Sequence, residues 1–169
     1  ILMIELPQYY VEYSEKEYSY SPGVGRENLK NALYKASGNY CMYCYNRIKI
    51  DENAYGQLEH AIESSIAAEK LKNCIPNIGI ACPVCNDKYK RIGEKGRIPD
   101  EEEIKQFIEK ADCGEKFCKK PCKAYRRFKR AYLKKDNAQF LIQPLGVRAA
   151  DIGIKEERHL RLQYDILNN

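Results

Sequence analysis

The sequence predicts an α+β protein in which a small metal-stapled core carries helical extensions at both ends. Eight cysteines occur among 169 residues, and four of them form two C-x2-C pairs. Segments with strand character lie between these pairs, and amphipathic helical patterns lie outside them. Apolar residues make up 44% of the chain and charged residues 31%, which is a globular composition and excludes a disordered chain.

We expect three parts: an arm over residues 1–25, a core over 26–95 and a mostly helical C-terminal extension over 96–169. The arm is rich in tyrosine and ends in a Pro- and Gly-containing stretch typical of irregular structure. Its tyrosines could stack on bases, but we expect them to pack the arm onto the domain. No apolar run reaches the ~18 residues of a membrane span, so we expect a cytoplasmic protein with no membrane contact.

Apolar spacing predicts a first helix over residues 27–39, with Leu29, Leu33 and Ala36 on one face and Gly38-Asn39 as its end. Pro99 and Asp100 open a later helix, whose first-turn glutamates suit the positive end of the helix dipole. The other expected elements, in chain order, are a strand at 56–62, a helical or irregular segment at 64–73, a turn, strand and helix start within 75–93, a helix from Pro121 to about Lys135, a strand at 139–147 and a helix at 154–167.

The two C-x2-C pairs are Cys41/Cys44 and Cys82/Cys85, separated by 37 residues. Each pair places two thiolates on one tight turn, so the two pairs together can supply the four corners of a tetrahedral zinc site. In a reducing compartment this spacing favours structural zinc over four unconnected thiols. A redox C-x-x-C is a weaker alternative, because no βαβ pattern surrounds either pair.

Polar residues between and just after these pairs suggest chemistry as well as stability. Glu59 and His60 lie on the expected strand, Asn77 precedes the next strand, and Asn86 directly follows Cys85. The string YCxYC…LEH…PNIGIACPVCN resembles the HNH endonuclease family, in its zinc-stapled branch with Asn as the last motif residue. The resemblance covers about residues 38–92 and implies a ββα-metal (HNH) core.

The resemblance also implies roles for these residues. His60 matches the general base, and Asn77 matches the residue that orients it. Glu59 and Asn86 match ligands of a catalytic Mg²⁺ or Mn²⁺, and a carboxylate with an amide oxygen suits such hard cations. Neutral imidazole can take a proton from water near pH 7, as phosphodiester hydrolysis requires.

The sequence departs from the common HNH pattern in three places. Glu59 stands where Asp is more usual, which lengthens the metal-binding arm by one methylene. Ala61, Ile62 and Glu63 follow the histidine where many relatives carry a proline and a basic residue. Tyr89 occupies the position of a frequent lysine. The last two departures put substrate contacts in doubt.

The remaining four cysteines could hold a second zinc. They are Cys74, Cys113, Cys118 and Cys122. Such a site would pin the C-terminal extension to a loop near the core, and the alternative is four buried free thiols. His159 could replace Cys74 as a ligand, although its surroundings in the sequence suit an exposed side chain.

Residues 116–135 hold ten basic side chains and no acidic one. In helical spacing Cys122, Tyr125, Phe128 and Tyr132 form an apolar stripe. A separate basic face consists of Lys123, Arg126, Arg127, Arg130 and Lys134. Solvated helices usually mix charges of both signs, so this face favours contact with a phosphate backbone over an acidic protein partner or plain solubility.

These patterns predict a metal-dependent HNH endonuclease that hydrolyses nucleic acid, with DNA favoured over RNA. The alternative is a zinc-stapled nucleic-acid-binding module that does not cleave. The Glu-His pair and the Cys-Asn ending also resemble the HNH subunits of Septu-type antiphage defence systems. That resemblance implies a separate ATPase subunit as partner, and the chain itself has no GxxxxGK[ST] motif.

Overall fold

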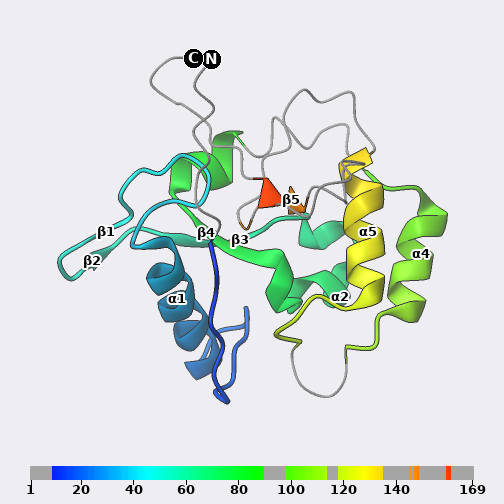
Figure 1. The fold of residues 1–169 in the computed structure, drawn as a ribbon, viewed down its shortest axis with the longest axis horizontal. Helices are drawn as coiled ribbons and strands as arrows, with labels where there is room; N and C mark the ends of the chain where they lie inside the picture. Colours follow the sequence, from blue (N-terminus) through cyan, green and yellow to red (C-terminus); the bar gives the residue numbers. More distant parts are fainter. Residues whose placement is uncertain are drawn as a thin grey trace.

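A computed structural model describes residues 9–89, 98–113, 118–134, 145, 147–148 and 159–160. A short antiparallel pair lies at the centre of the described fold (Figure 1). Strand β3 (Gln57–His60) pairs with β4 (Ile78–Ala81), and their register places Glu59 opposite Gly79 and His60 opposite Ile78. Cys82 follows β4 directly and begins the turn into the helical segment η3 (Val84–Tyr89). The predicted core therefore combines a short strand pair with helical segments that lie between the two strands and after them.

Helix α1 (Val24–Ser37) packs against one side of this pair. Its Leu29 and Leu33 are fully buried, as the helical spacing predicts, and Gly38 ends the helix in the left-handed conformation that glycine favours. A first hydrophobic cluster joins α1, the two strands and the four cysteines of the C-x2-C pairs. Each pair and its turn is called a knuckle below, and the knuckle cysteines are Cys41, Cys44, Cys82 and Cys85. Gly56 admits this close packing, because a Cβ there would lie 2.5 Å from the Tyr34 hydroxyl.

A second hydrophobic cluster lies on the other side of the strand pair (Figure 1). It is formed by α2 (Ala68–Lys72), α4 (Glu101–Lys110) and α5 (Lys123–Lys134). Phe107 of α4 stacks on Phe128 of α5, with ring centroids 4.6 Å apart. A capping box formed by Asp100 and Glu103 fixes the start of α4, in agreement with the predicted start signal. The strand pair therefore lies between two separate apolar clusters.

The remaining described elements are short. Strands β1 (Lys49–Ile50) and β2 (Asn53–Ala54) form a hairpin, and β5 (Val147–Arg148) pairs with β6 (His159–Leu160). Two 3-10 turns complete them, η1 (Ser64–Ile66) and η2 (Ile75–Asn77). None of the helices in the described part of the chain is long and apolar enough to cross a membrane.

Three expectations for these elements need correction. The β1–β2 hairpin is absent from the predicted elements, because its two-residue strands are too short for a periodic pattern. The helix expected over 154–167 is wrong at His159 and Leu160, because these residues form β6 and pair with β5. Its other residues lie outside the described part of the chain. The helix predicted from Pro121 begins at Lys123, because Cys122 caps it. Of the strand expected over 139–147, the described part includes Leu145 and Val147, and Val147 begins β5.

The N-terminal arm packs onto the core, as expected for most of its tyrosines. Tyr9 and Tyr18 are buried, whereas Tyr10 is 76% exposed. The arm also reaches the segment that connects the two central strands, because the Tyr20 backbone N–H donates to the Asn73 side-chain oxygen at 3.1 Å. This contact places Tyr20 beside the polar residues at the end of β3.

Candidate metal centre and catalytic site

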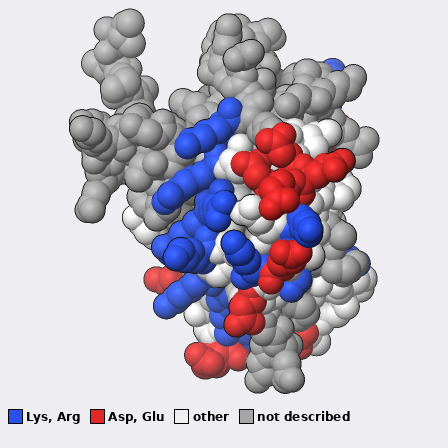
Figure 2. Space-filling view, turned by 90° about the vertical axis from the view of Figure 1, so that its right-hand side faces the viewer, with Lys and Arg blue, Asp and Glu red and all other residues white. Residues whose placement is uncertain are grey.

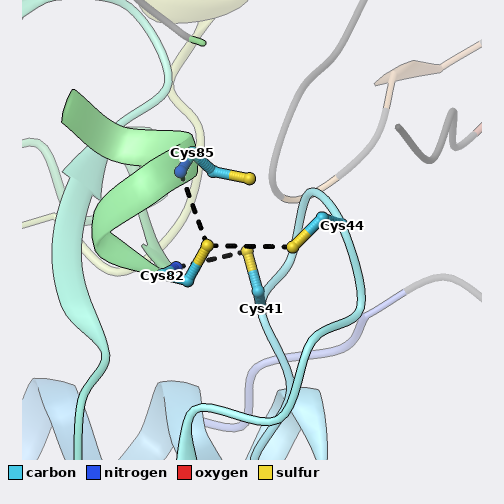
Figure 3. Close-up of side chains that lie close together, drawn as sticks. All are labelled: Cys41, Cys44, Cys82 and Cys85. Carbon is cyan, nitrogen blue, oxygen red and sulfur yellow. Dashed lines mark hydrogen bonds between the residues drawn. The ribbon is translucent and has the colours of Figure 1, made fainter. Parts of the chain in front are cut away.

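The four knuckle cysteines converge on one point (Figure 3). Cys41 and Cys44 come from the turn after α1, Cys82 directly follows β4, and Cys85 lies in η3. All four are buried, and their sulfur atoms lie within 4.8 Å of one another. The Cys44 and Cys82 sulfurs are 3.7 Å apart. Tetrahedral zinc with ~2.3 Å bonds requires sulfur separations of about 3.8 Å, so the donor set fits zinc.

Backbone N–H groups donate hydrogen bonds to two of these sulfurs and so stabilise their thiolate forms. The Cys82 N–H donates to the Cys41 sulfur at 3.2 Å, and the Cys85 N–H donates to the Cys82 sulfur at 3.4 Å. Hydrogen bonds from neighbouring thiols, Cys44 first, lower the pKa of Cys41 to about 7, and those from Cys41 lower the pKa of Cys82. The same shared protons raise the pKa of Cys44 and Cys85. A divalent metal would replace these protons and leave all four sulfurs as ligands.

Glu59 lies beside this centre on β3. Its side chain is 1% exposed, and its Oε2 accepts a hydrogen bond from the Tyr43 hydroxyl at 2.7 Å. Tyr43 stands between the two cysteines of the first knuckle, so the knuckle that holds the zinc ligands also holds this carboxylate. Tyr43 was not among the predicted site residues, although its place inside the C-x2-C turn could have indicated it.

Asn86 reaches the same side of the strand pair. Its Nδ2 donates to the Oε1 of Gln57 at 2.9 Å, and it is half-buried. Gln57 lies two residues before Glu59, and alternate residues of a strand share a face. Asn86 and Glu59 are therefore brought to one face of the pair, and the amide oxygen of Asn86 is its remaining acceptor. Gln57 was also missed, although strand alternation links it to Glu59.

His60 has different neighbours from Glu59. Adjacent strand residues point to opposite faces, and the His60 ring packs on Tyr20 of the arm with centroids 4.3 Å apart. Its Nε2 lies 3.0 Å from the Lys72 carbonyl oxygen. A carbonyl oxygen only accepts, so Nε2 donates, and in the neutral ring the lone pair lies on Nδ1. His60 is 6% exposed, so little of the ring is open to water.

Asn77 fixes the segment that follows His60. It is fully buried, its Oδ1 accepts from the Ile62 N–H at 2.9 Å, and its Nδ2 donates to the Ile62 carbonyl at 2.8 Å. The Ala61 N–H also donates to the Asn77 carbonyl at 2.7 Å. These bonds hold the backbone just after His60, so Asn77 acts on the histidine through the chain.

Helix α5 contributes a buried residue to this arrangement. The Tyr125 hydroxyl lies 3.1 Å from the Asn77 Oδ1 and 3.4 Å from the Pro76 carbonyl oxygen, and both are acceptors. Burial raises the pKa of Tyr125 well above its usual value, so the phenol stays protonated as a donor. The sequence indicated Tyr125 only as part of the apolar stripe, because its polar partner is 48 residues away.

The predicted basic face of α5 is exposed at every position. Its five residues are Lys123, Arg126, Arg127, Arg130 and Lys134. Figure 2 looks onto the side of the molecule that carries α4 and α5 and shows a band of Lys and Arg beside a group of acidic residues. The opposite face of the helix is buried, with Tyr125, Phe128 and Tyr132 each at most 2% exposed. The sequence-based division of the helix into an apolar stripe and a basic face is therefore correct.

The other four cysteines are half-buried, and Cys74, Cys113 and Cys122 pack against the second cluster. Within the described residues, the knuckle cysteines alone form a group of three or more acidic, histidine or cysteine donors at metal-binding separation. The sulfurs of Cys74, Cys113, Cys118 and Cys122 thus stand farther apart than those of the first centre. The backbone of His159 lies in β6, and its side chain is outside the described part of the structure.

The comparisons with known proteins add no family. No protein-family model matches the sequence, and no curated protein and no solved structure is significantly similar to the chain. What the structure defines is a mixed helix-and-sheet protein whose four buried cysteines can hold a metal such as zinc.

Proposed function

We propose that the chain is a zinc-stapled, metal-dependent HNH endonuclease that hydrolyses phosphodiester bonds, with DNA as the favoured substrate. The observation that carries the proposal is the set of polar residues around the strand pair next to the cysteine cluster. Glu59, His60 and Asn77 are almost fully buried, and each has a hydrogen-bond partner that offsets the cost of burial and fixes its position. Glu59 and His60 lie on β3, Asn77 ends the turn before β4, and Asn86 lies in η3 after β4, and these places are compatible with the ββα arrangement that the HNH resemblance implies.

His60 would act as the general base. The carbonyl of Lys72 fixes its tautomer, so that Nδ1 holds the lone pair that accepts a proton from water. Asn77 restrains the backbone after His60 and so limits the directions that the ring can take. Such restraint lowers the entropy that the reactive geometry costs.

Glu59 and Asn86 would hold the catalytic Mg²⁺ or Mn²⁺. A carboxylate and an amide oxygen on one face of the strand pair suit a hard cation that keeps water and phosphate in its remaining positions. When bound, the ion would stabilise negative charge on the phosphate oxygens. Tyr43 and Gln57 would keep the two ligand side chains in place through their hydrogen bonds.

The basic face of α5 would bind the phosphate backbone. Its five exposed cations carry no acidic residue among them, and release of counterions from nucleic acid would supply much of the affinity. The Tyr125–Asn77 hydrogen bond joins this helix to the proposed catalytic segment. A defence complex with a separate ATPase subunit would fit a small nuclease whose terminal elements are available for docking.

The experiment that tests the proposal incubates the zinc-loaded protein with plasmid DNA and with tRNA, each in Mg²⁺, in Mn²⁺ and without added divalent ion. We expect cleavage of the plasmid that depends on the added ion. In Glu59→Gln and Asn86→Ala, we expect weaker cleavage that higher Mn²⁺ partly restores, because these changes weaken the site of the ion. A folded protein that binds both nucleic acids and cuts neither would support the non-cleaving binding module instead.

A further inference from the structure

We propose that Cys74, Cys113, Cys118 and Cys122 bind a second structural zinc, which clamps the C-terminal helices to the segment that carries Asn77. The sequence alone leaves this site open, because the spacing of these cysteines is irregular. The structure adds evidence that the three segments carrying them meet. Cys74 lies between α2 and η2, Cys113 follows α4, and the other two precede α5.

Two hydrogen bonds join these segments, one from a residue before Cys74 in the sequence and one to a residue after it. The Lys70 ammonium donates to the Ala111 carbonyl at 3.0 Å, which ties α2, four residues before Cys74, to the chain just before Cys113. On the other side, the Tyr125 hydroxyl donates to the Pro76 carbonyl at 3.4 Å. Residues within four positions of Cys74, Cys113 and Cys122 are therefore already in contact.

The cysteines themselves gather at the same edge of the fold. Cys74, Cys113 and Cys122 pack against the second hydrophobic cluster. The Cys118 thiol lies 3.9 Å from the Asp112 carbonyl, next to Cys113. Three thiols at one apolar edge and a fourth beside Asp112 form a soft donor set, and such a set selects zinc over magnesium or calcium.

Repulsion between thiolates limits what these four cysteines can do without a metal. Four negative charges at one edge of the fold repel one another, so ionising all four thiols together is unfavourable in the absence of a cation.

Zinc removes that cost with a balanced exchange. Four S–H groups release four protons to solvent, and four thiolates bind one Zn²⁺, which leaves a site charge of −2. The start of α5 offsets part of this charge, because the Tyr125 backbone N–H donates to the Cys122 sulfur at 3.3 Å. Lys70 lies near enough to Cys118 to contribute a positive charge.

Closing the site requires the four sulfurs to move closer together. The four sulfurs stand farther apart than the ~3.8 Å of a tetrahedral zinc site. Each cysteine lies in a connection or at a helix end, so rotamer and loop changes can bring the sulfurs together while the stacked rings of Phe107 and Phe128 stay in place. The clamp would hold both ends of the Tyr125–Asn77 hydrogen bond, since each residue lies three positions after one of the ligands.

The test measures zinc per chain by elemental analysis in the parent and in Cys118→Ser, together with the reactivity of all eight thiols under native conditions. We expect two zincs and eight protected thiols in the parent. In Cys118→Ser we expect one zinc, reactive thiols at Cys74, Cys113 and Cys122, and continued protection of the four knuckle thiols. Tyr10→Phe is the control, because that side chain is 76% exposed and the variant should keep both zincs.

Native mass spectrometry of the parent decides the question if Cys118→Ser does not fold, because a mass of two zincs above the apoprotein needs no variant. One zinc per parent chain, with the second four thiols reacting as ordinary surface cysteines, would overturn the proposal. Two zincs retained in both Cys74→Ser and Cys118→Ser would overturn it too. Neither readout involves cleavage, so the result is independent of the proposed nuclease activity.

Discussion

The two sides of the strand pair hold their segments together by different means. On the side of α1, the regularly spaced cysteines meet at zinc distance, and hydrophobic residues of α1 pack against them. On the side of α5, a stacked pair of rings and a buried phenol join helices that are far apart in the sequence, and the sulfurs are more widely separated. The first side carries a cysteine cluster that can hold a metal, and the second is packed around buried aromatic rings, so the two should respond differently to substitution.

The largest expected effect follows from removing one knuckle ligand. Cys41→Ser or Cys85→Ser should leave the protein insoluble or sensitive to protease, because ligation energies of about 10–16 kcal/mol in structural zinc sites act directly as folding free energy. The measurement is soluble yield and limited proteolysis with the zinc content. Soluble, protease-resistant protein with no zinc would show that the α1 side does not need a bound metal to fold.

Truncation of the second cluster should cost less. Phe128→Ala deletes a ring that is 2% exposed and stacked on Phe107, and we expect a loss of about 3–5 kcal/mol in the free energy of unfolding. Denaturant titration measures it. Ile108→Ala is the control, since its side chain on α4 is 41% exposed and its removal should change stability by about 0.5 kcal/mol or less. Equal effects of both variants would show that α4 and α5 do not pack as described.

The hydrogen bond between the two sides can be tested alone. Tyr125→Phe keeps the buried ring and removes the hydroxyl that bonds Asn77, so we expect a loss of about 1–3 kcal/mol in the free energy of unfolding with zinc content unchanged. Tyr10→Phe is the matched control, because that tyrosine is 76% exposed. Identical thermal unfolding of the parent and Tyr125→Phe would mean that the hydroxyl does not couple α5 to the core.

The smallest expected effect on stability concerns the exposed face of α5. Replacing Arg126, Arg127 and Arg130 with Ala should leave unfolding nearly unchanged. The slope of log K against log salt for nucleic-acid binding should fall by about 0.9 for each phosphate that the variant no longer neutralises, at every sequence alike. Fluorescence anisotropy over a salt series measures the slope. A variant with the parental affinity and slope would assign this face to another partner.

The elements on the α1 side follow short-range spacing and could be predicted from the sequence. The contacts on the α5 side that join distant residues could not. The knuckle cysteines, Glu59 and the helices of the core follow short-range patterns, and the structure places them accordingly. Tyr20 beside His60 and Tyr125 beside Asn77 join residues 40 and 48 positions apart, and no periodicity indicates such pairs. The β5–β6 pair was missed for the same reason, because pairing partners decide between strand and helix for so short a segment.

The central claim is that His60 is the general base of a nuclease, and comparison of His60→Ala with the control His159→Ala tests it most directly. A general base contributes about 10²–10⁴-fold to the rate and little to substrate binding. At saturating Mg²⁺ and with an active parent, His60→Ala should therefore keep its zinc and its affinity for nucleic acid while it loses cleavage by that factor. His159→Ala should cut at the parental rate. Parental cleavage by folded His60→Ala would contradict the HNH mechanism and leave the zinc-stapled binding module as the better explanation.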